Sequence, residues 1–180
     1  MRRLLAVGNG RAADAILRQM HQYKHDFAIT VFGDGPLLRD RGWYTDHGIE
    51  LHEGVRVVSI DRHARLAQGS DGSFTTYDRL ILAIGMPGNN GLSIPGLQMR
   101  NGLIVNRSME TTDGYIYAIG GCAEVRDGRW AAKLDKQAQR LAARLVGESD
   151  GVDLTETKDR LKLAVVPKLD VEKTKKALIA

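Results

Sequence analysis

The stretch that most constrains the fold is an apolar segment near the start of the chain that breaks into glycines, residues 4–13 (LLAVGNGRAA). The strand that begins there is expected to reverse sharply at Gly8, and at Gly10 the missing Cβ lets a phosphate approach the backbone. Ala13 is small enough for close packing of the next helix on this strand. The N-terminal N–H groups of that helix, expected at residues 11–23, favour an anion. We interpret the stretch as a dinucleotide-binding turn.

A second apolar strand, expected at residues 27–32, is followed by Gly33 and Asp34. Asp34 lies about 20 residues past the first glycines, where dinucleotide-binding folds place the acid that holds the ribose hydroxyls. A G-x-G-x-x-A pattern is weak evidence alone, but its place between two predicted strands supports nucleotide binding. The alternative is a tight strand-to-helix turn that binds nothing.

The composition is typical of a globular protein, with 43% hydrophobic and 27% charged residues among 180. The net charge of +4 comes from basic residues scattered among acids, so nucleic-acid binding is not expected. Cys122 is the only cysteine, which excludes an internal disulfide and favours a reducing compartment. The apolar segment before Gly8 is too short for a signal peptide or a membrane span, so we expect a cytoplasmic protein that does not enter a membrane.

The remaining hydrophobic pattern predicts an α/β protein with a parallel sheet and an antiparallel β-meander. Short segments with period two alternate with turn signals over residues 49–74, which indicates the meander. Residues 37–47 form a short amphipathic segment, and residues 130–146 carry apolar side chains at helical spacing. Apolar strands are expected at residues 3–7, 27–32, 80–85, 102–106 and 115–121.

Three segments in this order resemble one family: residues 7–13 (VGNGRAA), 77–85 (YDRLILAIG) and 112–124 (TDGYIYAIGGCAE). They are similar to the FAD domain of the pyridine nucleotide-disulfide oxidoreductases, the glutathione-reductase-like superfamily. Within this superfamily, the sequence of these segments most resembles the branch that contains the large subunit of assimilatory NAD(P)H nitrite reductase and rubredoxin reductase. The resemblance implies a Rossmann-like, three-layer FAD-binding domain at residues 1–147. Residues 148–180 would then be a C-terminal extension, either a remnant of the family's interface domain or a partly ordered tail.

The resemblance also implies where FAD is held. Adenine and ribose would lie at Asp34, the pyrophosphate at Gly8, Gly10 and the helix that follows, and the flavin ring near the helix at residues 130–146. The N-terminal dipole of that helix would favour the negative charge that develops on the reduced ring. No side chain is expected to act as an acid, base or nucleophile, because the cofactor does the chemistry. The expected cofactor-binding residues are Gly8, Asn9, Gly10, Arg11, Ala12, Ala13, Asp34, Ala83, Gly85, Gly120 and Gly121.

Several departures from the family pattern affect these expectations. The family usually has an acid at the position of Gly121, where a carboxylate bonds the ribityl chain; its loss should weaken FAD binding by about 1–3 kcal/mol. Ile84 stands where most relatives have threonine, which removes a hydroxyl. Relatives carry a complete NAD(P)H domain after a segment like residues 94–97, whereas here the return strand follows almost at once. A further FAD-contacting loop of the relatives has no counterpart after Pro36.

We therefore expect an FAD-dependent oxidoreductase domain that passes electrons from NAD(P)H or a partner protein to an acceptor. The expected partner is a redox protein or a separate subunit that supplies the NAD(P)H-binding domain. Apolar surface exposed where that domain would dock favours a homodimer. The alternative is a non-catalytic dinucleotide-binding or structural module that has lost redox function. Gly121 and the lack of a nicotinamide domain between residues 97 and 102 favour this alternative, and the intact glycine turn favours the enzyme.

The other conspicuous residues have structural explanations. Cys122 is expected to be a buried small apolar residue rather than a redox thiol. Trp43 and Tyr44 are expected to cover an edge of the core rather than to stack on flavin. His21 and His25 lie four residues apart near a helix end, and we expect a solvated helix tip and no metal site.

Overall fold

The computed structural model describes residues 1–85, 92, 94, 96–126 and 133–147. Within this part of the chain, five parallel strands form a central sheet in the order β3-β2-β1-β7-β9. A three-stranded antiparallel meander and a two-stranded parallel sheet accompany it. The central strands are β1 (Arg2–Val7), β2 (Phe27–Gly33), β3 (Ile49–Glu53), β7 (Arg79–Leu82) and β9 (Ile116–Ala118). The meander contains β4 (Val57–Asp61), β5 (Leu66–Gly69) and β6 (Phe74–Thr76), and the small sheet β8 (Leu103–Val105) and β10 (Ala123–Val125).

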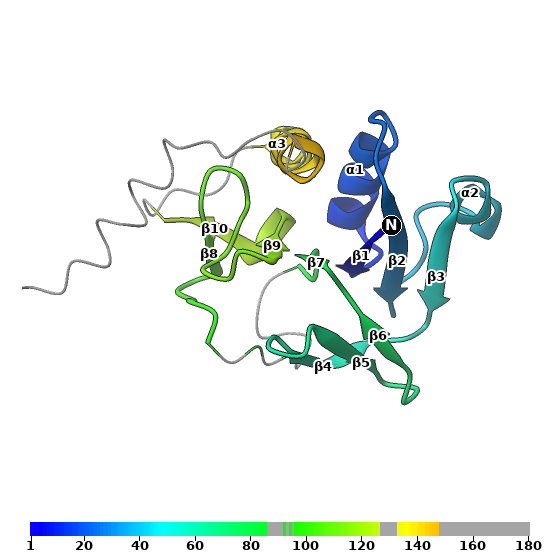
Figure 1. Ribbon diagram of the computed structural model, residues 1–180, viewed down its shortest axis with the longest axis horizontal. Helices are drawn as coiled ribbons and strands as arrows, with labels where there is room; N and C mark the ends of the chain where they lie inside the picture. The colour runs from blue at the N-terminus through cyan, green and yellow to red at the C-terminus, as the bar shows by residue number, and fades with distance from the viewer. Residues whose placement is uncertain (86–91, 93, 95, 127–132, 148–180) are drawn as a thin grey trace, which may run out of the picture. The chain divides into compact units, whose positions relative to one another are not determined.

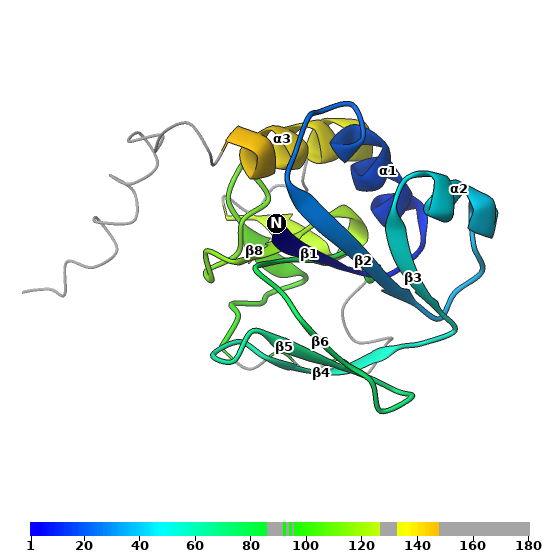
Figure 2. The ribbon, with the colours of Figure 1, turned by 45° about the vertical axis from the view of Figure 1, so that its right-hand side comes forward.

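The elements form three layers. Helices α1 (Arg11–Met20) and α3 (Leu134–Gly147) lie on one side of the central sheet, and the meander lies on the other (Figure 1). The short helix α2 (Arg41–Asp46) lies beside β3, as the turned view also shows (Figure 2). This arrangement confirms the predicted α/β fold with a parallel sheet and an antiparallel meander. No helix among the described residues is long and apolar enough to cross a membrane.

The strands β1 and β7 at the centre of the sheet begin with arginines and are apolar after them, because both faces of a central parallel strand are covered. In β9 all three residues are buried, and in β1 the last four residues are. Helix α1 is amphipathic and packs on the sheet with its apolar face, and it ends at Met20 rather than at the predicted residue 23. The buried residues of that face are Ala13, Ala15, Ile16, Leu17 and Met20.

The order of the strands fixes where a ligand can enter. The chain runs from β1 through α1 to β2 and through α2 to β3, moving away from β1 in one direction. It then returns to pair β7 with the opposite edge of β1. In open parallel sheets, ligands bind outside the carboxyl ends of the strands at the point where the strand order reverses. Here that point lies between β1 and β7.

The predicted meander begins too early in the sequence. Residues 49–53 form β3, which pairs in parallel with β2 through a register that joins Ile29 to Ile49 and Gly33 to Glu53. Helix α2 provides the crossover that a parallel connection needs. The antiparallel pattern holds only for β4, β5 and β6.

The last predicted strand is too long. Strand β9 ends at Ala118, and Gly120–Cys122 form a single 3₁₀ turn. Gly120 has a φ of +82°, which ends the extended backbone, and the chain then continues as β10, a strand that the sequence did not predict. The predicted helix at 130–146 is α3 from residue 134 onward, and residues 130–132 lie outside the described residues.

Asp78 links the beginnings of β1 and β7 by hydrogen bonds. Because its carboxyl titrates, we expect the stability of the fold to depend on pH. It accepts hydrogen bonds from the backbone N of Arg3 (2.7 Å) and from Nη2 of the same arginine (3.0 Å). The hydrogen bonds from the Arg3 side chain, above all, lower the pKa of Asp78 to about 2. A carboxyl with a lowered pKa stabilises the fold above its unfolded pKa, and this contribution is lost as the pH falls through the folded value.

We therefore expect Asp78→Asn to lower the free energy of unfolding at neutral pH by about 1–2 kcal/mol, allowing for partial exposure. The difference in the free energy of unfolding between the variant and the native protein should shrink between about pH 5 and pH 2, because the native carboxylate becomes protonated and loses its charge in this range. Urea unfolding across this range measures it, with Asp46→Asn, at an exposed position of α2, as the control. A difference that stays constant with pH would contradict the assigned role.

Candidate nucleotide-binding site

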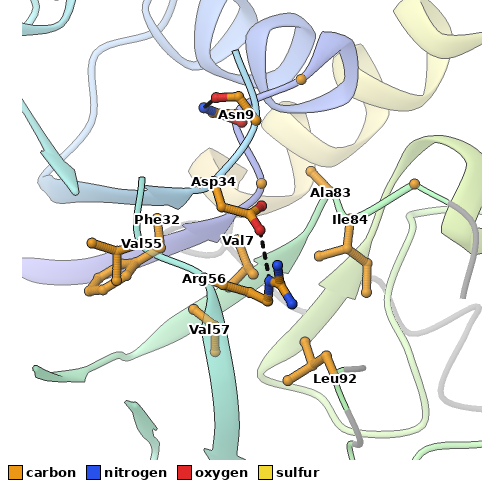
Figure 3. Close-up of a pocket in the computed structure, with 15 residues that line it drawn as sticks. Val7, Asn9, Phe32, Asp34, Val55, Arg56, Val57, Ala83, Ile84 and Leu92 are labelled. Atoms are coloured by element: carbon orange, nitrogen blue, oxygen red, sulfur yellow. Dashed lines mark hydrogen bonds and ion pairs between the residues drawn. The ribbon is translucent and has the colours of Figure 1, made fainter. Parts of the chain in front are cut away.

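A hollow of about 270 Å³ opens at the carboxyl ends of β1, β2 and β7 (Figure 3). Ligand pockets usually measure about 300–1,000 Å³, so this space suits part of a dinucleotide rather than the whole. It lies where the strand order reverses, the position at which parallel sheets bind ligands. Its walls are Val7, Gly8, Asn9, Gly10, Phe32, Gly33, Asp34, Gly35, Val55, Arg56, Val57, Ala83, Ile84, Gly85 and Leu92.

Gly8 makes the sharp reversal that the sequence predicts. Its φ is +107°, and its N–H donates to the carbonyl oxygen of Phe32 (2.6 Å). A Cβ at this position would lie 2.4 Å from the carbonyl oxygen of Ala83, at the end of β7. Glycine is therefore required here by backbone contact between neighbouring strands as well as by the turn.

Gly10 and the start of α1 present uncapped backbone to the hollow. Gly10 is the N-cap residue of α1, and no side chain caps the helix. A Cβ on Gly10 would meet no atom of the described residues within 4 Å, so the backbone there borders open space among them. Uncapped N–H groups at the beginning of a helix, with the positive end of its dipole, suit a phosphate anion. Of the other predicted residues of this turn, Ala13 is fully buried and Ala12 half-buried, so their side chains serve packing.

Asn9, also predicted as a binding residue, joins two turns of the hollow. Its Nδ2 donates to the carbonyl oxygen of Gly35 (2.6 Å), and its side chain is only 5% exposed. A Cβ on Gly33 would lie 2.4 Å from Cγ of Asn9, so the asparagine fills the space above that glycine. The amide of Asn9 thus fixes the turn after β1 against the turn after β2.

Asp34 follows β2 and lies at the mouth of the hollow with a half-exposed side chain. Its Oδ2 accepts a hydrogen bond from Nε of Arg56 (2.7 Å), and the two groups form an ion pair (Figure 3). Sequence reasoning missed Arg56, because it follows β3, which was assigned to the meander. Only the parallel pairing of β3 with β2 brings it there, and this pairing continues as the N–H of Gly54 donates to the carbonyl oxygen of Gly33 (2.8 Å).

The remaining predicted residues divide into two groups. Ala83 and Gly85 line the hollow, whereas Gly120 and Gly121 do not. Gly120 instead packs on α1, since a Cβ there would lie 2.7 Å from Cβ of Ala12, and its N–H donates to Oε1 of Gln137 in α3 (2.8 Å). Arg11 lines a separate hollow of about 500 Å³, with Asp14, Ala15, Arg18, Leu38, Leu134 and Asp135.

The residues that were expected to be structural lie outside the hollow. Cys122 is fully buried, and burial raises the pKa of its thiol to about 11. Tyr44 is buried, and the ring of Trp43 stacks on His47 with centroids 4.2 Å apart. Cys122 and Tyr44 are thus buried and Trp43 packs, partly buried, against the core, as predicted. His21 is exposed at the end of α1, and its ring lies 4.0 Å from that of His47.

Residues 41–143, more than half of the chain, match the family model described as "Pyridine nucleotide-disulphide oxidoreductase". The chain belongs to this family. Putidaredoxin reductase CamA of Pseudomonas putida is 30% identical over 169 residues, which cover 81% of this chain and 40% of that protein. Rubredoxin-NAD(+) reductase of Alcanivorax borkumensis is 31% identical over 113 residues, 59% of this chain and 30% of that protein. The chain thus spans less than half the length of these curated relatives.

Solved structures of reductases share the fold. Putidaredoxin reductase, in its covalent complex with putidaredoxin, superimposes with a TM-score of 0.70 at 16% identity, covering 81% of this chain and 75% of that chain. The ferredoxin reductase for the CYP199A2 system of Rhodopseudomonas palustris gives 0.70 at 17% identity, covering 85% and 78%. The family match and the curated relatives confirm the resemblance that the sequence showed, and the solved structures agree in fold. FAD is the cofactor that the family and the fold imply.

Proposed function

We propose that the hollow holds the ADP part of FAD and that residues 1–147 are the flavin-binding domain of an electron-transfer oxidoreductase. The observation that carries the proposal is the uncapped, open start of α1 at Gly10, at the same sheet edge as Asp34. A diphosphate and a ribose need these two kinds of group side by side. The residues present therefore fit the cofactor. Residues 148–180, in this proposal, are a separate extension.

Bound FAD would supply the redox chemistry. The chain's own residues would bind and orient it: the Gly10 backbone and the first turn of α1 face the diphosphate, and a carboxylate oxygen of Asp34 accepts from the ribose hydroxyls. The side chains of Ile84 and Leu92 line the hollow with apolar surface and exclude water from the bound nucleotide. No side chain of the described site is required as an acid or a base.

The electron donor in this proposal is NAD(P)H or a reduced partner protein, and the acceptor is a small redox protein. The names of two relatives support it, since one is a putidaredoxin reductase and another a rubredoxin-NAD(+) reductase. A separate subunit would supply the NAD(P)H-binding domain, and a homodimer would cover apolar surface of this chain.

The colour of the purified full chain tests the proposal. We expect absorption near about 375 and 450 nm from bound flavin, lost when NAD(P)H or dithionite is added without oxygen. A colourless protein whose melting temperature does not rise with added FAD would contradict it.

Gly121 favours a second candidate, a module that binds an adenine dinucleotide without redox turnover. This exposed glycine stands where the family's acid bonds the ribityl chain, so no carboxylate can hold that part of the cofactor from position 121. Such a protein would bind ADP and FAD with similar affinity, because the flavin half of FAD would contribute little to the free energy of binding. FAD binding at least about tenfold tighter than ADP binding would exclude this candidate.

Asp34 provides a direct test of the ribose contact. We expect Asp34→Ala to weaken FAD and ADP binding about tenfold, because a charge-assisted hydrogen bond to the ribose is lost. Asp46→Ala removes an exposed carboxylate from α2, away from the hollow, and should leave the affinity unchanged. Titration calorimetry measures both variants, and equal affinity of Asp34→Ala and the native chain would refute the assignment.

A further inference from the structure

The ion pair at the mouth of the hollow contains a group that a ribose-binding acid does not need. Asp34 and Arg56 are the only charged residues among those described that line the hollow. Arg56 donates from Nε to Asp34, and its backbone N donates to Oγ of Ser70 (3.1 Å). Its Nη1 and Nη2 make no hydrogen bond within the described part of the chain. No group among the described residues occupies these two guanidinium nitrogens.

The guanidinium is presented from a fixed backbone. The N–H of Ser70 donates to the carbonyl oxygen of Arg56 (2.7 Å), which closes a reciprocal pair of hydrogen bonds across the start of the meander. The next residue, Val57, is only 2% exposed. Figure 3 shows the guanidinium beside Asp34, on the side of that carboxylate that faces Ile84 and Leu92.

Guanidinium and carboxylate recognise different forms of a ribose. A carboxylate accepts hydrogen bonds from free ribose hydroxyls, whereas a nearby arginine accommodates a phosphate ester on one of them. The planar fork of arginine binds a phosphate with two parallel hydrogen bonds, and such pairs are stronger than single contacts. Both groups line one hollow here, and they form an ion pair.

We propose that Arg56 lets this site also accept an adenine nucleotide that carries a phosphate on its ribose. This inference rests on the proposed function, in which the ADP part of a nucleotide occupies the hollow. Both side chains of the ion pair are about half exposed, at 56% for Arg56 and 46% for Asp34, and exposed pairs are weak. A ribose phosphate can therefore replace the carboxylate as the partner of the guanidinium. The ligand class is ADP and its derivatives, with or without a ribose phosphate.

Calorimetric titration of the full chain with ADP and with 2′-phospho-ADP tests the proposal, with FAD as the competitor that shows both bind in the hollow. We expect the two dissociation constants to lie within about tenfold of each other. Arg56→Gln should weaken binding of 2′-phospho-ADP by about 10–100-fold and change that of ADP by about threefold or less. Arg107→Gln removes the same charge from an exposed position outside the hollow and should change the affinity for neither nucleotide. Asp34→Asn should weaken the binding of ADP and strengthen the binding of 2′-phospho-ADP.

Two results would overturn this inference and leave the proposed function intact. One is a native chain that binds ADP but binds 2′-phospho-ADP more than about 100-fold more weakly. The other is an Arg56→Gln variant that is folded, by its thermal melt, and loses the same factor for both nucleotides. A native chain that binds neither nucleotide nor FAD would instead contradict the proposed function.

Discussion

Gly10→Val is expected to weaken FAD and ADP binding by about 100-fold or more, which corresponds to about 2.7 kcal/mol, while the protein stays folded. A Cβ on Gly10 would meet no atom within 4 Å in the part of the chain that the structure describes. The two methyl groups of valine would occupy the place that the proposal gives to the diphosphate. The backbone at this position, with φ −83° and ψ −165°, is extended and suits any residue. The cost in stability should be about 1 kcal/mol, since valine is a poorer N-cap residue than glycine.

Gly147→Val provides the matched control for this variant. Gly147 is the last residue of α3, and a Cβ there also meets nothing within 4 Å. We expect unchanged nucleotide affinity in the control, and an intermediate loss of about tenfold in Gly10→Ala, whose side chain is smaller. FAD titration followed by fluorescence, with circular dichroism of each variant, measures these effects. Unchanged affinity of a folded Gly10→Val protein would place the nucleotide elsewhere.

Gly8→Ala is expected to lower the free energy of unfolding by about 2–5 kcal/mol, a large part of the total for a domain of this size. A positive φ costs a residue with a Cβ about 1–2 kcal/mol. The methyl group would also lie 2.4 Å from the carbonyl oxygen of Ala83, which must move and strain the pairing of β1 with β7, at about 1–3 kcal/mol. Urea unfolding monitored by circular dichroism measures the loss.

Gly72→Ala separates the two contributions. Gly72 has a φ of +83°, but it is exposed and a Cβ there would meet no atom within 4 Å. In this control the free energy of unfolding should fall only by the about 1–2 kcal/mol that a positive φ costs a residue with a Cβ. Equal losses in Gly8→Ala and Gly72→Ala would show that the contact with Ala83 does not restrict residue 8.

The ion pair of Asp34 with Arg56 shows why only one of these two residues could be predicted from the sequence. Asp34 could be predicted because its relation to the glycine turn is one of spacing along a single β-α-β unit. Arg56 could not, since its place beside Asp34 depends on β3 pairing in parallel with β2. The alternating pattern of residues 49–53 is equally compatible with an antiparallel neighbour, so the pattern alone does not choose the partner strand.

The sequence by itself determined the elements whose signals are local: the glycine turn at residues 8–10, the buried strands β1, β2 and β7, and the amphipathic helices. Their apolar spacing and their glycines act within a few residues, and they place the site at one edge of a parallel sheet. Only the tertiary structure decided which side chains meet there. Asn9 fills the space above Gly33, and Gly120 lies against Ala12 instead of lining the hollow, because these contacts join residues far apart in the chain. Such contacts depend on strand order and close packing, which a local pattern does not encode.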